Sequence, residues 1–213
     1  MRIRSNLLIG TVLVLFATPA VAQSNNEDFW KDKWFWGGQV GGFLYSAGGS
    51  QEAGVGVGGH WFITAGHSAL NFAFDQLVLT NSSVLLANGR QVDFSDGQRI
   101  QATVYATPST GDLQIYLGGG FAIQHITDAT PIGTFNSQSE LIATLDQVER
   151  LSTKAFAVLG GGVQWRWFKR WVIFAQYQLM PSTDDFLITS AQHSIQGGLR
   201  IALTAANEMA ATR

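Results

Sequence analysis

Residues 154–179 read KAFAVLGGGVQWRWFKRWVIFAQYQL, two runs of alternating residues joined by an aromatic and basic connection. Alternation with period two is the pattern of a β-strand, because successive side chains leave the pleated backbone on opposite sides. Each run is about ten residues long, the length that crosses a bilayer when a strand tilts by roughly 45°. One face of the first run holds Ala155, Ala157, Leu159, Gly161, Val163 and Trp165, and one face of the second holds Trp171, Ile173, Ala175, Tyr177 and Leu179.

The connection between the two runs, residues 165–171, contains three tryptophans and three cationic side chains. Amphipathic rings and long cationic side chains are favoured at a membrane–water interface. The stretch therefore predicts a transmembrane β-hairpin whose turn lies at an interface.

The chain begins with a segment typical of exported proteins. Arg2 and Arg4 precede a mostly apolar run, 7–17, and the sequence Ala20-Val21-Ala22 follows. This pattern predicts a signal peptide over residues 1–22, cleaved after Ala22, and export by the Sec pathway. The alternative is an N-terminal membrane anchor, although the apolar run is short for a membrane-spanning helix.

Composition narrows the class of protein. The full chain has a formal net charge of -2, and the predicted signal peptide removes two arginines and no acid, so the mature chain is more acidic. Nucleic-acid partners favour a basic face, so none is expected. The chain has no cysteine, which excludes disulfides and cysteine metal sites, and its 24 glycines suit closely packed strands. The length fits one domain.

Six further segments alternate in the same way and give eight strands in total. They are residues 34–45, 52–61, 70–75, 100–107, 113–124 and 190–203. A bilayer cannot satisfy the polar groups of a free strand edge, so a transmembrane sheet must close. The expected fold class is an all-β, closed, antiparallel up-and-down transmembrane barrel of eight strands, with short periplasmic turns and longer extracellular loops.

The two longest connections fall at the same rim of this barrel. Asn88-Gly89 between extended segments is a strong hairpin signal, and it predicts strands that continue beyond the membrane. In the connection 126–153, Ser137 and Glu140 have capping-box spacing before apolar residues at helical spacing, which predicts a short helix. Asn88, Gly89 and Glu140 are the predicted extracellular loop tips.

Tryptophan residues are concentrated at the opposite rim. An aromatic girdle at the periplasmic interface is predicted from Trp34, Trp36, Trp61, Trp165, Trp167 and Trp171. Residues 23–33 are expected to form a periplasmic N-terminal tail, either loose or carrying a short interfacial helix. The barrel is expected over residues 34–203, and residues 204–213 are expected to form a C-terminal periplasmic tail.

The last strand carries a motif that resembles a known family. Gln196, Gly198, Ile201 and Leu203 have the order polar, glycine, apolar, apolar, which is similar to the β-signal of outer-membrane proteins. With the signal peptide and the eight alternating segments, the chain resembles the small eight-stranded outer-membrane barrels of the OmpA transmembrane domain and OmpX group. The family usually ends in an aromatic residue, whereas TAANEMAATR follows Leu203 here. The resemblance implies residence in the outer membrane of a Gram-negative-type bacterium.

The same resemblance implies partners. They are outer-membrane lipids and lipopolysaccharide, and the barrel-assembly machinery during biogenesis. Separately, the outer hairpin near Asn88 and the loop near Glu140 favour an extracellular partner at the second and third outer loops. Nucleic acid is not expected.

The inward faces of the predicted strands are polar. A lumen network is expected from Gln39, Asp75, Tyr105, Tyr116, Gln164, Gln176, Gln196 and Arg200. A buried charge needs a partner, so Asp75 or Glu52 is expected beside Arg99 or Arg200. Eight strands enclose a lumen wide enough only for side chains or one small ligand, which favours a plugged core over a narrow pore.

No pattern in the sequence predicts catalysis, a metal or a cofactor. His60 and His67 flank one turn but lack a third ligand with fixed spacing. Neighbours such as His193 and Ser194 point to opposite faces of a strand and cannot form a dyad. Outer-membrane lipid A deacylases place His and Ser two residues apart, and the nearest approach here is His125-Ile126-Thr127.

Two classes of function remain at this stage. The first is a non-enzymatic envelope protein with a structural, adhesive or surface-interaction role, whose extended outer strands offer edges for strand addition. The second is a narrow channel or small-ligand carrier that uses the lumen. A soluble periplasmic lipocalin-like barrel is a third alternative, which would require the apolar faces to line a cavity.

Overall fold

The computed structural model describes residues 27–108, 111–181 and 185–203. The predicted signal peptide and the predicted C-terminal tail lie outside the described residues. The barrel strands are β1 (Trp34–Ala47), β2 (Ser50–Ala65), β3 (Ser68–Leu85), β4 (Gln91–Ala106), β5 (Leu113–Ile126), β7 (Thr153–Phe168), β8 (Trp171–Met180) and β9 (Gln192–Leu203). The remaining elements are α1 (Glu27–Trp30), β6 (Thr130–Ile132) and α2 (Gln138–Leu151).

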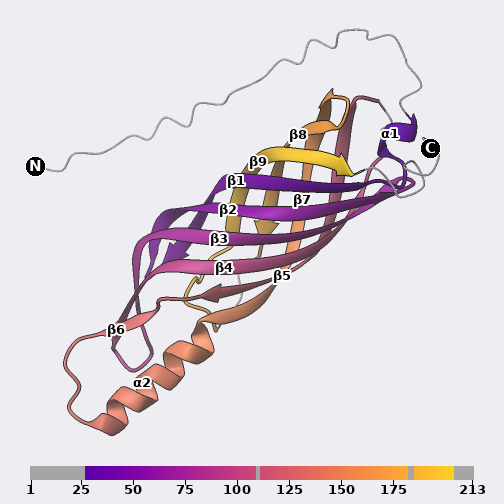
Figure 1. Ribbon diagram of the computed structural model, residues 1–213. Coiled ribbons are helices and arrows are strands. Elements are labelled where there is room, and N and C mark those ends of the chain that lie inside the picture. Colours follow the sequence, from indigo (N-terminus) through magenta and orange to yellow (C-terminus); the bar gives the residue numbers. More distant parts are fainter. Residues whose placement is uncertain (1–26, 109–110, 182–184, 204–213) are drawn as a thin grey trace, which may run out of the picture.

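These eight strands form one closed antiparallel sheet, the barrel shown in Figure 1. Each strand pairs with its neighbour in the chain, except that β5 pairs with β7 past the excursion containing β6 and α2. The first and last strands close the barrel along a seam that runs from Trp34 opposite Leu203 to Leu44 opposite His193. The predicted fold class is confirmed.

Side chains alternate between the outside and the lumen, as period two requires. On β1, Val40 outside is 56% exposed, whereas Gln39 inside is 5% exposed. The outer wall is apolar over most of its height, as illustrated by Leu117 and Phe121, and the lumen contains both polar and apolar side chains. This arrangement suits a wall that faces lipid. Neither α1 nor α2 is long and apolar enough to cross a membrane.

Most strands are longer than the sequence pattern indicated, but β9 begins at Gln192 and not at residue 190 as predicted. β7 continues through Trp167 to Phe168, so the turn that was predicted over 165–171 consists of Lys169 and Arg170 alone. β2 continues beyond the predicted segment 52–61 to Ala65, so the following turn lies at Gly66 and His67. In both strands, pairing with the neighbouring strand continues past the alternating sequence pattern, to Ala65 opposite Ser68 and to Phe168 opposite Trp171.

Glycine permits two local features of the barrel. Gly89 has φ of 78°, a left-handed conformation that suits the predicted Asn88-Gly89 turn. A Cβ at Gly54 would collide with the ring of Phe43, so this lumen-facing glycine makes room for an aromatic side chain on the adjacent strand.

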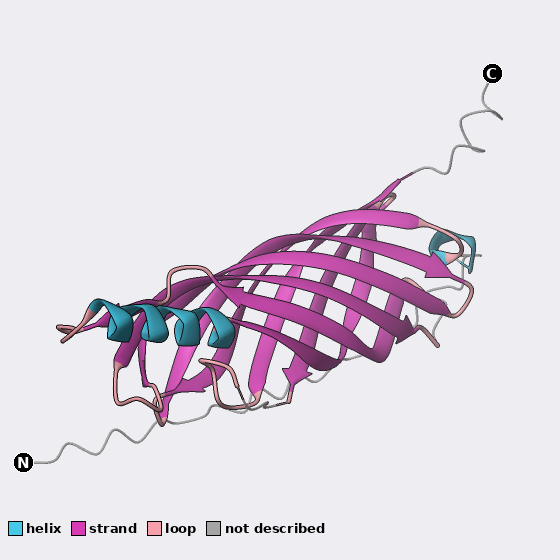
Figure 2. Ribbon diagram, turned by 90° about the horizontal axis from the view of Figure 1, so that it is seen from below, coloured by secondary structure: helices cyan, strands magenta, loops and turns pink. Residues whose placement is uncertain are grey.

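One end of the barrel carries a lobe made of residues 79–96, the ends of β3 and β4 with their turn, and residues 127–151, which include β6 and α2. Following the orientation predicted from the sequence, we call it the extracellular lobe and call the opposite end of the barrel the periplasmic end. Figure 2 shows α2 beside the strands at the end opposite α1. The Ser137 side chain accepts a hydrogen bond from the Glu140 amide at 3.2 Å, so Ser137 caps the helix as predicted. The Glu140 carboxylate accepts from the Asn136 amide at 2.9 Å, and not from the Ser137 amide that a complete capping box would use. The helix prediction is confirmed, whereas β6, which pairs with β4, was not predicted.

Candidate functional site

The lumen is filled by three layers of side chains. An apolar cluster from Phe43, Leu77, Phe156 and Met180 occupies the extracellular half. A second apolar cluster, which includes Phe35 and Phe62, occupies the periplasmic end. Polar side chains lie between them, so the barrel has a filled core.

The polar layer is centred on a buried ion pair. Arg99 donates from Nη2 to Asp75 Oδ2 at 2.8 Å and from Nε to the same oxygen at 3.2 Å. Their side chains are 0% and 1% exposed, respectively. Gln39 donates to Asp75 Oδ1 at 2.6 Å, and Gln196 donates to Oδ2 at 3.4 Å. The buried carboxylate is therefore held by donors from three other strands.

The network continues toward the periplasmic end. Gln176 donates to Gln196 at 2.7 Å and accepts from the Tyr116 hydroxyl at 3.2 Å. The ring of Tyr105 packs edge-on against Tyr116, with centroids 5.0 Å apart. Most of the side chains expected in a lumen network are thus in contact with one another.

Arg200 is stabilised in a different way from Arg99. It donates from Nε to His60 Nε2 at 2.8 Å and also donates to Gln164 Oε1. Its guanidinium lies 4.0 Å from the ring centroids of both Phe62 and Phe174. None of the salt bridges found among residues 27–108, 111–181 and 185–203 involves Arg200. Of the two arginines considered for a carboxylate partner, only Arg99 has one. Aromatic faces stabilise the cation of Arg200.

A segment that was expected to be a tail closes the periplasmic end. Trp30, at the end of α1, is only 3% exposed and packs in the same cluster as Phe35. Its indole nitrogen donates to the Gly111 carbonyl at 2.8 Å. Arg166 lies over the ring of the neighbouring Phe29, 4.8 Å from its centroid. Phe29 and Trp30 therefore belong to the core, for which an aromatic pair in a polar segment was the only sequence signal.

The connection between β8 and β9 closes the extracellular end. Phe186, Leu187 and Ile188 are 4%, 1% and 0% exposed and belong to the extracellular apolar cluster. The Leu187 amide donates to the Leu151 carbonyl at 3.1 Å, which joins this connection to the end of α2. Sequence reasoning missed this plug, although three consecutive apolar residues in a polar connection were visible.

The predicted extracellular loop tips come together in the lobe. Arg90, next to Gly89, forms an ion pair with Glu140 and lies 5.0 Å from the ring centroid of Phe135. Asn88 donates to the Thr144 hydroxyl of α2 at 3.2 Å. The hydrogen bond from Arg90 holds the pKa of Glu140 below its usual value. The β3–β4 turn is therefore fastened to the helix.

A second carboxylate orders the base of the lobe. Asp128, between β5 and β6, accepts from the amides of Ser95 and Asp96, each at 2.9 Å. Burial raises the pKa of Asp128, but the hydrogen bonds from Ser95 and Asp96 outweigh it, and the pKa lies below its usual value. Asp128 therefore fixes the break between β5 and β6.

The histidines lie apart from one another. His60 faces the lumen, and His67 lies exposed in a periplasmic turn. His125 contacts the Thr153 hydroxyl through Nδ1 at 2.7 Å, and His193 contacts the Tyr177 hydroxyl at 2.6 Å, both on the outer wall. Within the described part of the chain, no group of three or more His, Asp or Glu side chains is placed to hold a metal.

The remaining predicted residues lie at the periplasmic rim and on β9. Trp34, Trp36, Trp165, Trp167 and Trp171 are exposed on the outer wall, and Trp61 is partly covered by Trp34 and Trp36. In the β-signal, Gln196 is buried in the lumen, whereas Ile201 and Leu203 face outward. Gly198 pairs with Gln39 across the seam.

This geometry defines the class as a small, closed, eight-stranded barrel of the outer-membrane type. No protein-family model matches the chain, and no curated protein matches it. Neisserial surface protein A matches with a TM-score of 0.54 and 11% identity over 79% of this chain and 96% of that one.

Two barrels from Pseudomonas aeruginosa match as well. The N-terminal barrel domain of OprF gives a TM-score of 0.50 with 13% identity over 81% of this chain and 98% of that one. OprG gives 0.50 with 8% identity over 83% and 98%. These likenesses confirm at the level of fold the resemblance drawn from the sequence.

Proposed function

We propose that this protein is a non-enzymatic outer-membrane protein that displays its extracellular lobe as an interaction surface. The observation that carries the proposal is the contrast between a lumen closed at both ends and a lobe built to a defined shape. Trp30 closes the periplasmic end and Leu187 the extracellular end. The filled lumen argues against the alternative of a channel or small-ligand carrier.

The lobe has two properties of a recognition surface. Arg90 and Asp128 fix its shape through the contacts described above, so a partner would meet a preorganised surface. Its charged side chains are mostly acidic, which favours a basic partner by electrostatic complementarity. The acids are Asp93, Asp96, Asp128, Glu140, Asp146 and Glu149, against the cations Arg90 and Arg150.

The topology has a direct test because the natural chain has no cysteine. Ser139→Cys on α2 should be labelled on intact cells by a membrane-impermeant maleimide. His67→Cys, exposed in a periplasmic turn, is the matched control and should react only after the outer membrane is permeabilised. Labelling of both or neither on intact cells would overturn the assignment of the lobe to the cell surface.

Conductance separates this proposal from the channel alternative. In planar bilayers the wild-type chain should give no stable steps, because apolar side chains fill both ends of the lumen. A variant with Phe186, Leu187 and Ile188 changed to serine should admit water at the extracellular end. Reproducible steps from the wild-type chain would favour the channel instead.

A further inference from the structure

The helix α2 carries two large apolar side chains on the surface of the extracellular lobe. Ile142 is 51% exposed and Leu145 is 46% exposed. Residues three apart lie one turn apart on the same side of a helix, so the two side chains are neighbours. On its inner side the helix buries Val148 in the extracellular apolar cluster and Thr144 beside the β3–β4 turn. The apolar pair is therefore left on the outer side of the helix.

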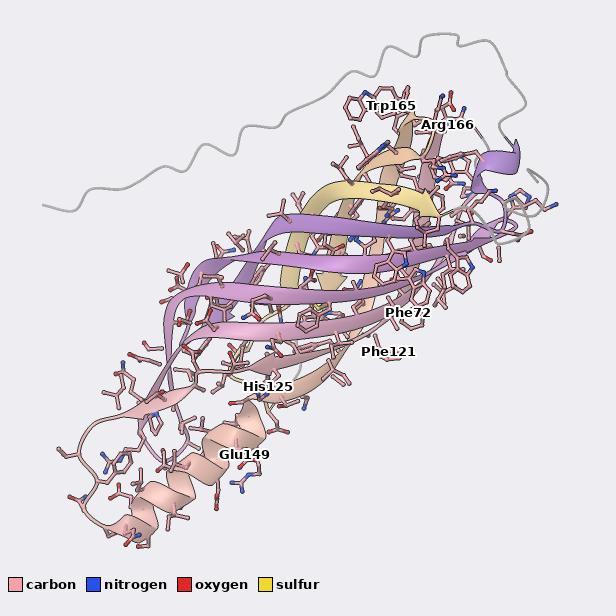
Figure 3. All side chains as sticks on the ribbon, in the orientation of Figure 1. Phe72, Phe121, His125, Glu149, Trp165 and Arg166 are labelled. Carbon is pink, nitrogen blue, oxygen red and sulfur yellow. The ribbon has the colours of Figure 1, made fainter. Side chains whose placement is uncertain are left out.

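This pair lies beyond the part of the barrel that lipid covers. On β7 the outward side chains change from apolar to polar at the exposed Thr153. From there α2 extends away from the barrel (Figure 1), and Ile142 lies about 13 Å along the helix from Leu151. Figure 3 shows Glu149 of α2 at the end of the molecule opposite Trp165. Apolar side chains that lie together on a water-exposed surface with a polar rim are typical of interaction sites.

Two carboxylates flank the apolar pair. Asp146 follows Ile142 by one turn and Glu149 follows Leu145 by one turn, so both acids lie on the same outer side of the helix. Both acids are exposed, and neither takes part in a salt bridge within the part of the chain that the structure describes. Arg150 is the only cation of α2. The outer side of the helix is therefore apolar at its centre and acidic around it.

The helix is held at both ends, so this surface keeps its shape. Ser137 caps the start of α2, and the ion pair between Arg90 and Glu140 fastens the first turn to the β3–β4 turn. At the other end the Leu187 amide donates to the Leu151 carbonyl at 3.1 Å. A preorganised surface loses little conformational freedom when a partner binds to it.

The strand edge of the lobe is a weaker candidate for partner binding. β6 lies at the edge of the sheet and consists of Thr130, Pro131 and Ile132. Proline has no N–H to donate, and a short edge strand that contains proline is protected against strand addition. A partner of the lobe is therefore expected at α2 and not at this edge.

We propose that Ile142, Leu145, Asp146 and Glu149, which we call the α2 face, bind a cationic amphipathic helix of a partner protein. Apolar side chains of the partner cover Ile142 and Leu145, and its lysines or arginines pair with the two carboxylates. A second copy of this chain does not fit, because two α2 faces in contact would bring like charges together. The inference rests on the proposed function of the lobe and names the chemistry of its partner.

The test uses the mature chain folded in phosphatidylcholine nanodiscs, with an environment-sensitive dye attached to Ser139→Cys. Ser139 is exposed and lies one turn before Ile142, so the dye reports binding at α2 and not binding to the bilayer. The probe is a synthetic helical peptide of leucine and lysine, with the leucines on one face and the lysines on the other. Binding should be saturable and should weaken as the salt concentration rises.

Two double variants separate the apolar from the charged contribution. Ile142→Gln with Leu145→Gln keeps good helix formers and should weaken peptide binding about tenfold or more, because the apolar area that the peptide covers is lost. Asp146→Asn with Glu149→Gln should also weaken binding and should make it less dependent on salt.

An exposed apolar residue elsewhere in the lobe provides a matched control. Leu85 is 68% exposed at the end of β3, where it pairs in register with Gln91 of β4. It belongs to the sheet of the lobe and not to α2. Leu85→Gln should therefore leave peptide binding unchanged.

Several outcomes would overturn the α2 face. They are unchanged binding in either double variant, an equal loss in Leu85→Gln, and equally tight binding of oligolysine, which lacks the apolar side chains. Self-association of the wild-type chain that Ile142→Gln with Leu145→Gln abolishes would assign the face to a second copy instead. The Ser139→Cys labelling on intact cells reports topology independently. If that labelling succeeds and peptide binding fails, the exposure of the lobe stands and only the α2 face is lost.

Discussion

The lumen and the extracellular lobe are each fastened by an arginine and a carboxylate, but in opposite surroundings. Asp75 and Arg99 are almost completely buried, whereas the side chains of Arg90 and Glu140 are 21% and 32% exposed. Water compensates a broken pair at the surface, but it cannot reach a charge left alone in the core. Breaking the arginine–carboxylate pair should therefore reduce stability much more in the lumen than in the lobe.

The largest effect is expected from breaking the buried pair. Asp75→Asn leaves Arg99 without its carboxylate and should lower the free energy of unfolding by about 3–5 kcal/mol. Urea unfolding in detergent micelles, followed by tryptophan fluorescence, measures this loss. The double variant Asp75→Asn, Arg99→Met removes both charges and should recover much of the stability. A double variant no more stable than Asp75→Asn alone would contradict the ion-pair explanation.

An intermediate effect is expected at Arg200, which has ring and amide partners in place of a carboxylate. Arg200→Met keeps the apolar packing but leaves Gln164 and His60 without their donor, at a cost of about 1–3 kcal/mol. Arg200→Lys keeps the charge and loses the planar stacking on Phe62 and Phe174, so it should be no more stable than the methionine variant. Wild-type stability for Arg200→Lys in the same unfolding assay would show that stacking is unimportant.

The smallest effect is expected in the lobe. Glu140→Gln removes the ion pair with Arg90 and should leave global unfolding nearly unchanged, but hydrogen exchange in α2 should become faster. The folded pKa of Glu140 is lowered, so its contribution is present at neutral pH and is lost as the pH falls through that lowered value. Asp146→Asn, also exposed on α2, is the control and should leave exchange unaltered. A clear fall in global stability for Glu140→Gln would remove the contrast between lobe and lumen.

Sequence reasoning succeeded where the backbone repeats. The alternation of residues such as Val40 and Gln39 fixed which side chains face lipid and which face the lumen, because a one-residue slip would reverse every strand. The Asn88-Gly89 turn and the Ser137 cap are local signals with their own geometry. Each of these features depends on residues close together in the chain.

Sequence reasoning failed where distant segments meet. The insertion of Trp30 depends on the Gly111 carbonyl, far along the chain, and the plug formed by Leu187 depends on the end of α2. Nothing in the local pattern states that Arg200 would meet Phe62 and Phe174 in place of an acid. Contacts inside a lumen depend on side-chain length and on the stagger of the strands, which periodicity does not specify.

The seam between β1 and β9 limits when this molecule can reach its final form. Every other strand pair of the barrel joins strands linked by one turn or connection, from which pairing can propagate. In the seam, Trp34 and Leu203 lie at the two ends of the barrel sequence. The barrel therefore cannot close until β9 has been synthesised. A chain that stops before β9 leaves β1 with an unpaired edge. Closure of this barrel is accordingly an event that follows synthesis of every residue up to Leu203.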